Sequence, residues 1–314
     1  MNIPKRVVAV VPYVEINGLQ HEMSAFKAWK MLGGDSIEHP HPFRLLHHFL
    51  YRHQFPRLWQ NRQEARLKFL SGYKLFFQAY PDYIDHEIIP LFWDCWPECQ
   101  ERVKRFLRRN NVRIAIFTSS QVAKMMQDEF PQMQILSITE GIDTEAYSEG
   151  KALSERNVDV IEFGRRTNVI GTMKLPSHVR HLYSKNGEKL FASNSDFYHA
   201  LADSKLTLAF PRSITHPEMT GSIETLTQRY WENMLCRIIM VGKAPQELVD
   251  LIGYNPVIDM DTSSPSEQIV GILEDVSSYQ ALVDKNRETA LKQGPWTLRI
   301  AEIRKFLTQN SYIV

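Results

Sequence analysis

Short apolar runs alternate with longer amphipathic stretches along most of the chain, which predicts strands that alternate with helices. The run at residues 7–11 is continuous and rich in β-branched side chains, as in a strand buried on both faces of a parallel sheet. A helical pattern follows at residues 21–32, and Gly33 and Gly34 end it. The alternation predicts later strands at residues 88–92, 113–117, 134–138, 158–163, 206–210, 238–241 and 256–259. It predicts later helices at residues 98–109, 120–129, 196–202, 226–234, 247–251 and 297–307, and from residue 264 onward.

This order of elements indicates an α/β fold with parallel sheets and right-handed crossovers. The chain opens with a strand, a glycine-bearing loop and a helix, which is typical of a Rossmann-like domain. Its 314 residues are enough for two such domains. Residues 140–155 are polar and have no periodic apolar face, so we expect them to link one domain to the next.

Residues 39–77 depart from the pattern because they combine many aromatic side chains with histidines and arginines, and Glu64 is their only acid. We expect helices here, broken near Pro56 and Gly72. Three interpretations stay open. The segment is a lid over a bound substrate, a patch that rests on anionic lipid, or a helical hairpin with aromatics in the core and arginines in solvent.

Composition narrows the class of protein. Hydrophobic residues make up 43% and charged residues 23%, a normal balance for a globular protein. The 37 basic and 36 acidic side chains nearly cancel, which argues against nucleic acid as a partner. Three cysteines are too few for a disulfide framework, and no run approaches the about 20 apolar residues of a membrane span. We therefore expect a cytoplasmic protein, with membrane association left open.

The most informative stretch lies at the start of the helix expected at residues 226–234. Thr225 and Gln228 have the spacing of a capping box. With Thr225 as the N-cap, the backbone N–H groups of Leu226, Thr227 and Gln228 would point outward without partners. The helix dipole adds positive charge at this end, so it could bind a diphosphate.

Two glutamates flank this helix start. Glu232 lies about two turns into the helix, where its carboxylate could accept hydrogen bonds from two ribose hydroxyls. Glu224 lies just before the cap, near the place where a sugar would project from the diphosphate. Glu232 taken alone could instead be a solvated surface charge on an amphipathic helix.

The spacing of these glutamates, with seven residues between them, is that of a known motif. Thr227, Arg229 and Glu232 also follow the pattern Thr-x-Arg-x-x-Glu. The segment resembles the large group of retaining nucleotide-sugar glycosyltransferases with the GT-B fold, in particular its shorter members related to spore-coat-type glycosyltransferases. Three more elements resemble the same group, in the same order. They are Asn17-Gly18 with Glu22, Glu140-Gly-Ile-Asp143 and Phe163-Gly-Arg-Arg166.

The resemblance implies two Rossmann-like domains that face each other across a cleft. Residues 1–150 would bind the acceptor and residues 151–290 the nucleotide sugar. Residues 291–314 would form a C-terminal helix that returns to the N-terminal domain. The implied activity is hexosyl transfer from a nucleotide-diphosphate donor to a glycan or lipid-linked acceptor, with retention, in polysaccharide or glycoconjugate biosynthesis. The residues themselves leave retention and inversion open.

The same reasoning assigns roles to individual residues. Glu224 and Arg165 would be catalytic, because the arginine faces the diphosphate in the group. The donor-binding candidates are Gly164, Arg165, Arg166, Arg212, Glu224, Thr225, Leu226, Thr227, Arg229 and Glu232. The acceptor-binding candidates are Asn17, Gly18, His21 and Asp94. Asp94 could instead cap the helix near Pro97, His21 could be an ordinary helix residue, and Arg165 and Arg166 could be surface ion-pair partners.

We expect no metal and no cofactor, because arginines and a helix N-terminus can stabilise the charge that a departing nucleoside diphosphate gains. One departure concerns that charge: the group commonly has a lysine a few residues after its Gly-Arg, and here the first lysine is Lys174. Arg166, Arg212 and Lys189 are the alternatives for it. Two other functions also stay open: a catalytically silent sugar-nucleotide-binding subunit, and an epimerase or hydrolase of the same architecture, for which we find no acid and base pair.

Overall fold

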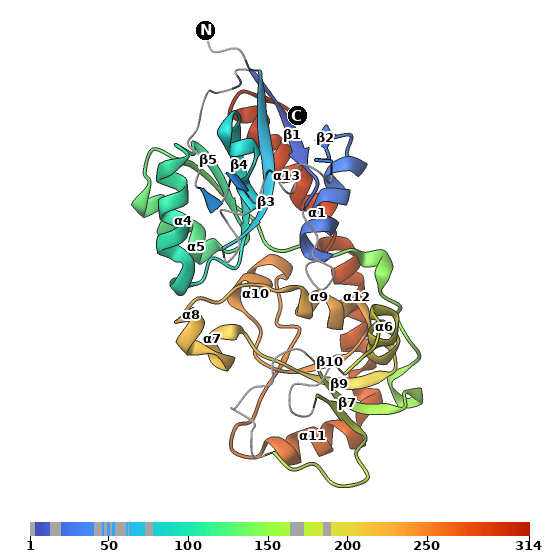
Figure 1. The fold of residues 1–314 in the computed structure, drawn as a ribbon. Helices are drawn as coiled ribbons and strands as arrows, with labels where there is room; N and C mark the ends of the chain where they lie inside the picture. The colour runs from blue at the N-terminus through green and yellow to red at the C-terminus, as the bar shows by residue number, and fades with distance from the viewer. Residues whose placement is uncertain are drawn as a thin grey trace. The chain divides into compact units, whose positions relative to one another are not determined.

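A computed structural model describes most of the chain, namely residues 4–12, 20–40, 46, 49–50, 52–53, 61, 63–72, 78–163, 173–184 and 190–314. The chain forms two compact units (Figure 1). The first unit comprises Met1–Glu140 and Trp296–Val314, and the second comprises Gly141–Pro295. The predicted elements recur in both units as parallel strands connected by helices.

The first unit is built on a seven-stranded sheet in the order β12-β1-β3-β4-β5-β6, with β2 also paired to β1. Every pairing is parallel. The strands are β1 (Lys5–Val10), β2 (Ser36–Ile37), β3 (Glu64–Ser71), β4 (Glu87–Trp93), β5 (Ile114–Phe117), β6 (Gln134–Ser137) and β12 (Tyr312–Ile313).

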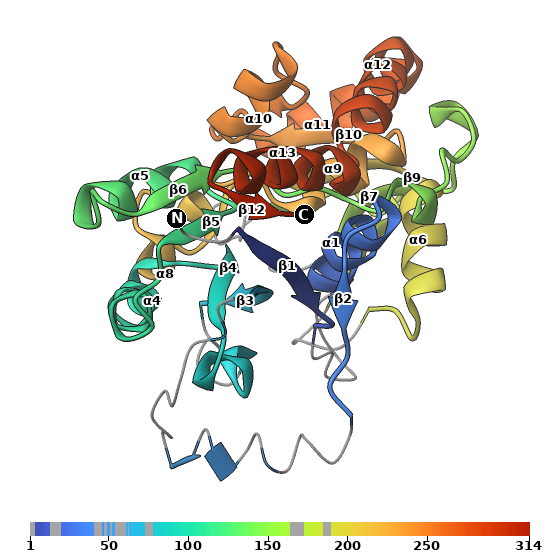
Figure 2. The same cartoon turned by 90° about the horizontal axis from the view of Figure 1, so that it is seen from above.

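Helices cover both faces of this sheet. They are α1 (Gln20–Met31), α4 (Pro97–Arg109), α5 (Ser120–Glu129) and α13 (Trp296–Gln309), with a short 3₁₀ helix, η1 (Asp82–Ile84). On one face α1 and α13 pack side by side, and Trp29 and Ile303 are buried against the strands there (Figure 2). On the other face, Phe92 of β4 meets Phe106 of α4 edge to face. The last helix thus belongs to the N-terminal unit, which confirms the predicted return of the chain.

The strand β3 corrects the expectation of helices in part of residues 39–77: residues 64–71 form a strand, whereas residues 46, 49–50 and 52 are helical. Its sequence alternates polar and apolar side chains, and Ala65, Leu67 and Phe69 enter the core. The intervening Arg66 and Lys68 are also buried, because both form ion pairs with the buried carboxylate of Asp82. The alternation of apolar and polar residues at every second position is the pattern of a strand. It was not recognised because the polar positions carry basic side chains, which are rarely buried without a partner.

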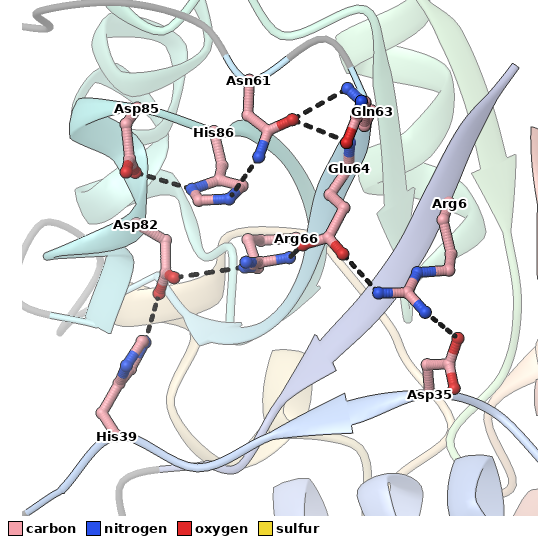
Figure 3. A network of polar contacts seen from close by, with 10 residues as sticks. All are labelled: Arg6, Asp35, His39, Asn61, Gln63, Glu64, Arg66, Asp82, Asp85 and His86. Atoms are coloured by element: carbon pink, nitrogen blue, oxygen red, sulfur yellow. Dashed lines mark hydrogen bonds and ion pairs between the residues drawn. The ribbon is translucent and has the colours of Figure 1, made fainter.

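Figure 3 shows the polar network around this part of β3. His39 Nε2 lies 2.8 Å from Asp82 Oδ2, and Arg66 donates to Glu64 Oε2 at 2.7 Å. Glu64 also pairs with Arg6 of β1. Burial disfavours the ionised form of Asp82, but the charge of Lys68 and the His39 contact outweigh it and hold its pKa below the ordinary value. The network lies in the amino-terminal half of the strands and ties β1, β3 and η1 together.

The second unit has a five-stranded parallel sheet in the order β11-β10-β9-β7-β8. The strands are β7 (Val158–Glu162), β8 (His181–Tyr183), β9 (Ser204–Ala209), β10 (Ile239–Gly242) and β11 (Ile258–Asp259). The α-helices are α6 (Asn194–Ala202), α7 (Arg212–Thr215), α8 (Pro217–Thr220), α9 (Gln228–Leu235), α10 (Gln246–Ile252), α11 (Pro265–Glu274) and α12 (Gln280–Gln293). The described 3₁₀ helices of this unit are η2 (Thr144–Ala146), η3 (Leu153–Glu155) and η5 (Val276–Tyr279).

Two apolar cores hold this second sheet. Trp231 and Met234 of α9 pack with Ala209 of β9 in one core. Ile269 of α11 packs with Leu208 of β9 in the other. Because neighbouring residues of β9 enter different cores, the strand is buried on both faces, as a parallel strand between two helical layers should be.

The two ends of the second unit's chain lie side by side within that unit. The Ile142 N–H donates to the Gly294 carbonyl at 2.9 Å, and Ile142 also forms a β-bridge with Pro295. The segment expected to be a linker is therefore partly ordered by these bonds and by η2 and η3. In the described part of the chain, no helix has the length and apolar character needed to cross a bilayer.

Candidate functional site

The predicted donor residues that the structure describes, from Arg212 to Glu232, lie between β9 and β10 in the second unit, and their partners include residues at the carboxyl ends of β7 and β10. The chain leaves β7 at Phe163, β9 just before Arg212, and β10 at Lys243. Loops at the carboxyl ends of parallel strands are the usual place for ligands in open α/β sheets. Gly164, Arg165 and Arg166, which follow Phe163, lie outside the described residues.

The start of α9 differs from the predicted capping box. The helix begins at Gln228, its N-cap is Thr227, and no side chain caps it. The side chain of Gln228 donates to the Gly141 carbonyl at 3.1 Å. The Leu226 N–H, expected to be unpaired, donates to Glu247 Oε2 of α10 at 2.8 Å. The predicted capping box at Thr225 was thus wrong. The helix begins later, and the Leu226 N–H is bonded to the carboxylate of Glu247, which is distant in sequence.

Glu232 lies in the second turn of α9 and is half-buried. Its Oε1 accepts a hydrogen bond of 2.9 Å from the Tyr147 hydroxyl. Burial raises the pKa of Glu232 above its ordinary value, whereas the Tyr147 bond and the charge of Arg229 act in the opposite direction. Burial, followed by the neighbouring Glu232 carboxylate, raises the pKa of Tyr147, so this phenol is a hydrogen-bond donor at neutral pH. Tyr147 therefore fixes the orientation of the Glu232 carboxylate.

Arg229 is held by an aromatic cluster next to the end of β7. Its guanidinium lies over the ring of Phe163, 5.4 Å from the centroid. Phe163 in turn packs edge to face on Phe197 of α6, with centroids 5.0 Å apart. A cation over an aromatic face is stabilised by the ring's quadrupole, so this contact directs the Arg229 side chain from the first turn of α9 toward the end of β7.

Glu224 is half-buried in the loop before α9. Its Oε1 lies 3.5 Å from Ser213 Oγ, at the long limit of a hydrogen bond, and 3.7 Å from Lys243 Nζ. Arg212, the first residue of α7, lies nearby in sequence, and its Nη2 is 3.2 Å from Met219 Sδ. Lys243 is not among the residues predicted from the sequence, although it directly follows the glycine that ends β10.

The predicted acceptor residues belong to the first unit. Asn17 and Gly18 lie outside the described residues, and of His21 only the backbone, in α1, is described. Asp94 follows β4 in a left-handed conformation with φ of 51°, and its Oδ1 accepts from the Trp96 indole N–H at 3.2 Å. The N-cap of α4 is Trp96, so Asp94 is not the cap that the alternative interpretation suggested.

Glu22 is a second acidic group of the first unit. It lies in the first turn of α1 with a side chain that is almost fully buried. Its Oε1 is 3.3 Å from the amide nitrogen of Gln78, whose oxygen accepts from the Ser71 N–H at the end of β3. These bonds hold a carboxylate at the carboxyl edge of the first sheet.

One possible metal motif was overlooked in the sequence. Asp259-Met260-Asp261 is an Asp-x-Asp, a pattern that can bind a metal ion. In the structure, Asp261 accepts bonds from the hydroxyls of Ser263 and Ser264, at 2.6 and 2.7 Å. These bonds, Ser263 first, lower the pKa of Asp261 to about 2. Among the described residues, no three His, Cys, Asp or Glu side chains are grouped as a metal site would require.

Comparison with known proteins shows which fold this is. No model of a known protein family matches the sequence, and no curated protein is significantly similar to it. Solved structures do match over nearly the whole chain, and they are glycosyltransferases with the GT-B fold. This chain therefore has the GT-B fold, as the motifs predicted.

Three of these structures show the extent of the likeness. HepE from Anabaena, solved with UDP-glucose, is 13% identical with a TM-score of 0.60, over 96% of this chain and 99% of HepE. A sucrose-phosphate synthase from Thermosynechococcus elongatus is 12% identical with a TM-score of 0.57, over 98% and 99%. A glycosyltransferase from Rickettsia africae is 12% identical with a TM-score of 0.54, over 98% of each chain. At such identities the likeness concerns the fold, and individual residue roles rest on the site itself.

Proposed function

We propose that this protein is a glycosyltransferase that binds a nucleotide-diphosphate sugar at the carboxyl ends of β7, β9 and β10. The observation that carries the proposal is the arrangement around α9. Arg229 and Glu232 lie in the first two turns of one helix, and Glu224 lies in the loop before it, at the sheet edge where ligands usually bind. The likeness of the fold to glycosyltransferases supports this assignment.

Each group suits one part of the donor. The Glu232 carboxylate, oriented by Tyr147, would accept hydrogen bonds from the ribose hydroxyls. The N-terminus of α9 and Arg229 would stabilise the diphosphate, since a helix dipole and a guanidinium both favour phosphate oxygens. Arg165, Arg166 and Gly164, outside the described residues, remain proposed as further donor contacts, with Arg165 catalytic.

The catalytic contribution of these cations is electrostatic. A departing nucleoside diphosphate gains negative charge as the sugar is transferred, so cations aimed at it stabilise the transition state more than the ground state. We propose a glycan or lipid-linked acceptor bound by the first unit through Asn17, Gly18, His21 and Asp94. Retention, independence of metal and a role in polysaccharide or glycoconjugate biosynthesis belong to the same proposal, as does membrane contact through the part of residues 39–77 outside the buried strand β3.

UDP-glucose is the first donor to test, because HepE was solved with it. Thermal unfolding is measured with and without UDP and UDP-glucose, for the wild type and for Glu232→Gln. Glutamine keeps an acceptor for Tyr147 but removes the charge. The matched control is Glu274→Gln, which changes an exposed glutamate of α11 in the same unit.

Ligand at a hundred times its dissociation constant should stabilise the wild type by about 2.7 kcal/mol. Loss of hydrogen bonds to a charged group should weaken binding by roughly 10- to 100-fold in Glu232→Gln. The control should keep wild-type affinity. Equal affinity in all three proteins would show that Glu232 is not at the nucleotide. Release of UDP together with transfer or slow hydrolysis of the sugar separates an enzyme from a silent binding subunit, and conversion to an epimeric nucleotide sugar would indicate an epimerase.

A further inference from the structure

The loop after β10 brings a lysine to the carboxylate of Glu224. Lys243 Nζ lies 3.7 Å from Glu224 Oε1, and Ser213 Oγ lies 3.5 Å from the same oxygen. Ser213 lies after β9, Glu224 lies before α9, and Lys243 lies after β10. Together they place a carboxylate, an ammonium and a hydroxyl within one small polar cluster, which we call the Glu224 cluster.

Both backbone polar groups of Lys243, its N–H and its carbonyl, form hydrogen bonds. Its N–H donates to the Ala209 carbonyl at 2.8 Å, and its carbonyl accepts from the Tyr230 hydroxyl at 2.8 Å. Gly242 before it has a φ of 148°, and a Cβ there would lie 2.0 Å from the Ala209 oxygen. This close approach of β10 to β9 is open only to glycine. The half-exposed lysine therefore starts from a rigid backbone.

The loop that carries Glu224 is anchored as well. The Leu226 N–H is bonded to Glu247 at the start of α10, and the Leu226 side chain is fully buried. Both partners of the ion pair are thus held by the fold before any ligand binds. Preorganised donors and acceptors lose less entropy on binding than mobile ones.

The charge balance of the cluster indicates which part of the donor it suits. Lys243 and Glu224 have opposite charges and cancel, so the pair offers little net attraction to a diphosphate. It offers both acceptors and donors at short range, which matches a row of sugar hydroxyls, since each hydroxyl donates one hydrogen bond and accepts others.

We propose that Lys243 and Ser213, with Glu224, bind the hydroxyl groups of the transferred sugar and determine which sugar is accepted. The proposal rests on the proposed function and extends it by two residues. Glu224 accepts hydrogen bonds from the sugar, and Lys243 and Ser213 donate to its hydroxyl oxygens. The nucleotide is bound elsewhere, at Glu232, so the two parts of the donor can be tested separately.

The experiment measures the dissociation constants of UDP and of UDP-glucose by calorimetry. The proteins are the wild type, Lys243→Met, Ser213→Ala and a control, Lys205→Met. Lys205 also forms an ion pair, with Asp159 at 2.7 Å, but it lies near the amino end of β9. The melting temperature of each unliganded variant shows whether it folds, and Ser213→Ala changes too little to disrupt the loop.

Lys243→Met should weaken UDP-glucose binding roughly 10- to 100-fold and Ser213→Ala roughly 2- to 10-fold, while UDP affinity stays within about twofold of the wild type. Lys205→Met should bind both ligands normally. Equal loss for UDP and UDP-glucose in Lys243→Met would place the lysine at the phosphates and overturn the proposal, as would no loss for either. A wild type that binds neither ligand would instead overturn the proposed function, and this extension with it.

Discussion

Replacing Glu247 by alanine should loosen the loop that carries Glu224, because Glu247 accepts the Leu226 N–H at 2.8 Å. Leu226 is fully buried, so its N–H would be left without an acceptor inside the protein. An unsatisfied buried donor costs about 1–3 kcal/mol. Loss of an acid from the first turn of α10 adds about 0.3–1 kcal/mol through the helix dipole. We therefore expect the free energy of unfolding to fall by about 2 kcal/mol.

A matched control separates these two contributions. Glu267 lies in the first turn of α11 and is exposed, so Glu267→Ala removes an acid from a comparable position without breaking such a bond. Urea denaturation followed by far-ultraviolet circular dichroism gives both losses, and we expect only the smaller one in the control. A loss in Glu247→Ala no larger than in Glu267→Ala would refute the reasoning, since the bond to Leu226 would then contribute nothing.

Two further predictions concern buried contacts, one in each unit. Lys68→Met removes a buried cation beside Asp82 and should lower the free energy of unfolding by about 3 kcal/mol at pH 7, measured by urea denaturation. The folded state lowers the pKa of Asp82, so the ionised carboxylate stabilises the fold above its unfolded pKa of about 3.9, and this stabilisation is lost as the pH falls. The loss of unfolding free energy in Lys68→Met should therefore become smaller in acid. A loss that does not change with pH would contradict this. Gly242→Ala places a Cβ against the Ala209 carbonyl and should lower the free energy of unfolding by about 3 kcal/mol. Gly271→Ala, which has open space in α11, should raise it by about 0.5–1 kcal/mol. Similar melting temperatures for the two variants would contradict this expectation.

The fold was predictable because its signals are repeated. Apolar runs such as residues 158–163 mark strands buried on both faces, and most of the expected strands and helices occur within a few residues of their predicted bounds. The strand β3 escaped because Arg66 and Lys68 look like surface residues, and only the structure reveals Asp82 beside them. Burial of charge depends on a partner distant in sequence, which the local pattern cannot supply.

The candidate site was predictable only where its residues are close in sequence. The glutamate pair and Arg229 could be identified from their spacing in one segment. The partners of these residues could not, since Tyr147 and Lys243 come from other loops and meet Glu232 and Glu224 only in the folded unit. Local spacing also suggested a capping box at Thr225, but a carboxylate from α10 took the place of the side-chain cap.

The central claim is that a nucleoside diphosphate binds at the start of α9, and hydrogen–deuterium exchange with and without UDP tests it most directly. The account predicts slower exchange in peptides that cover residues 224–232 when UDP is bound, with little change in the first unit's network around Asp82. Protection confined to other parts of the chain, with residues 224–232 unaffected by saturating UDP, would contradict it.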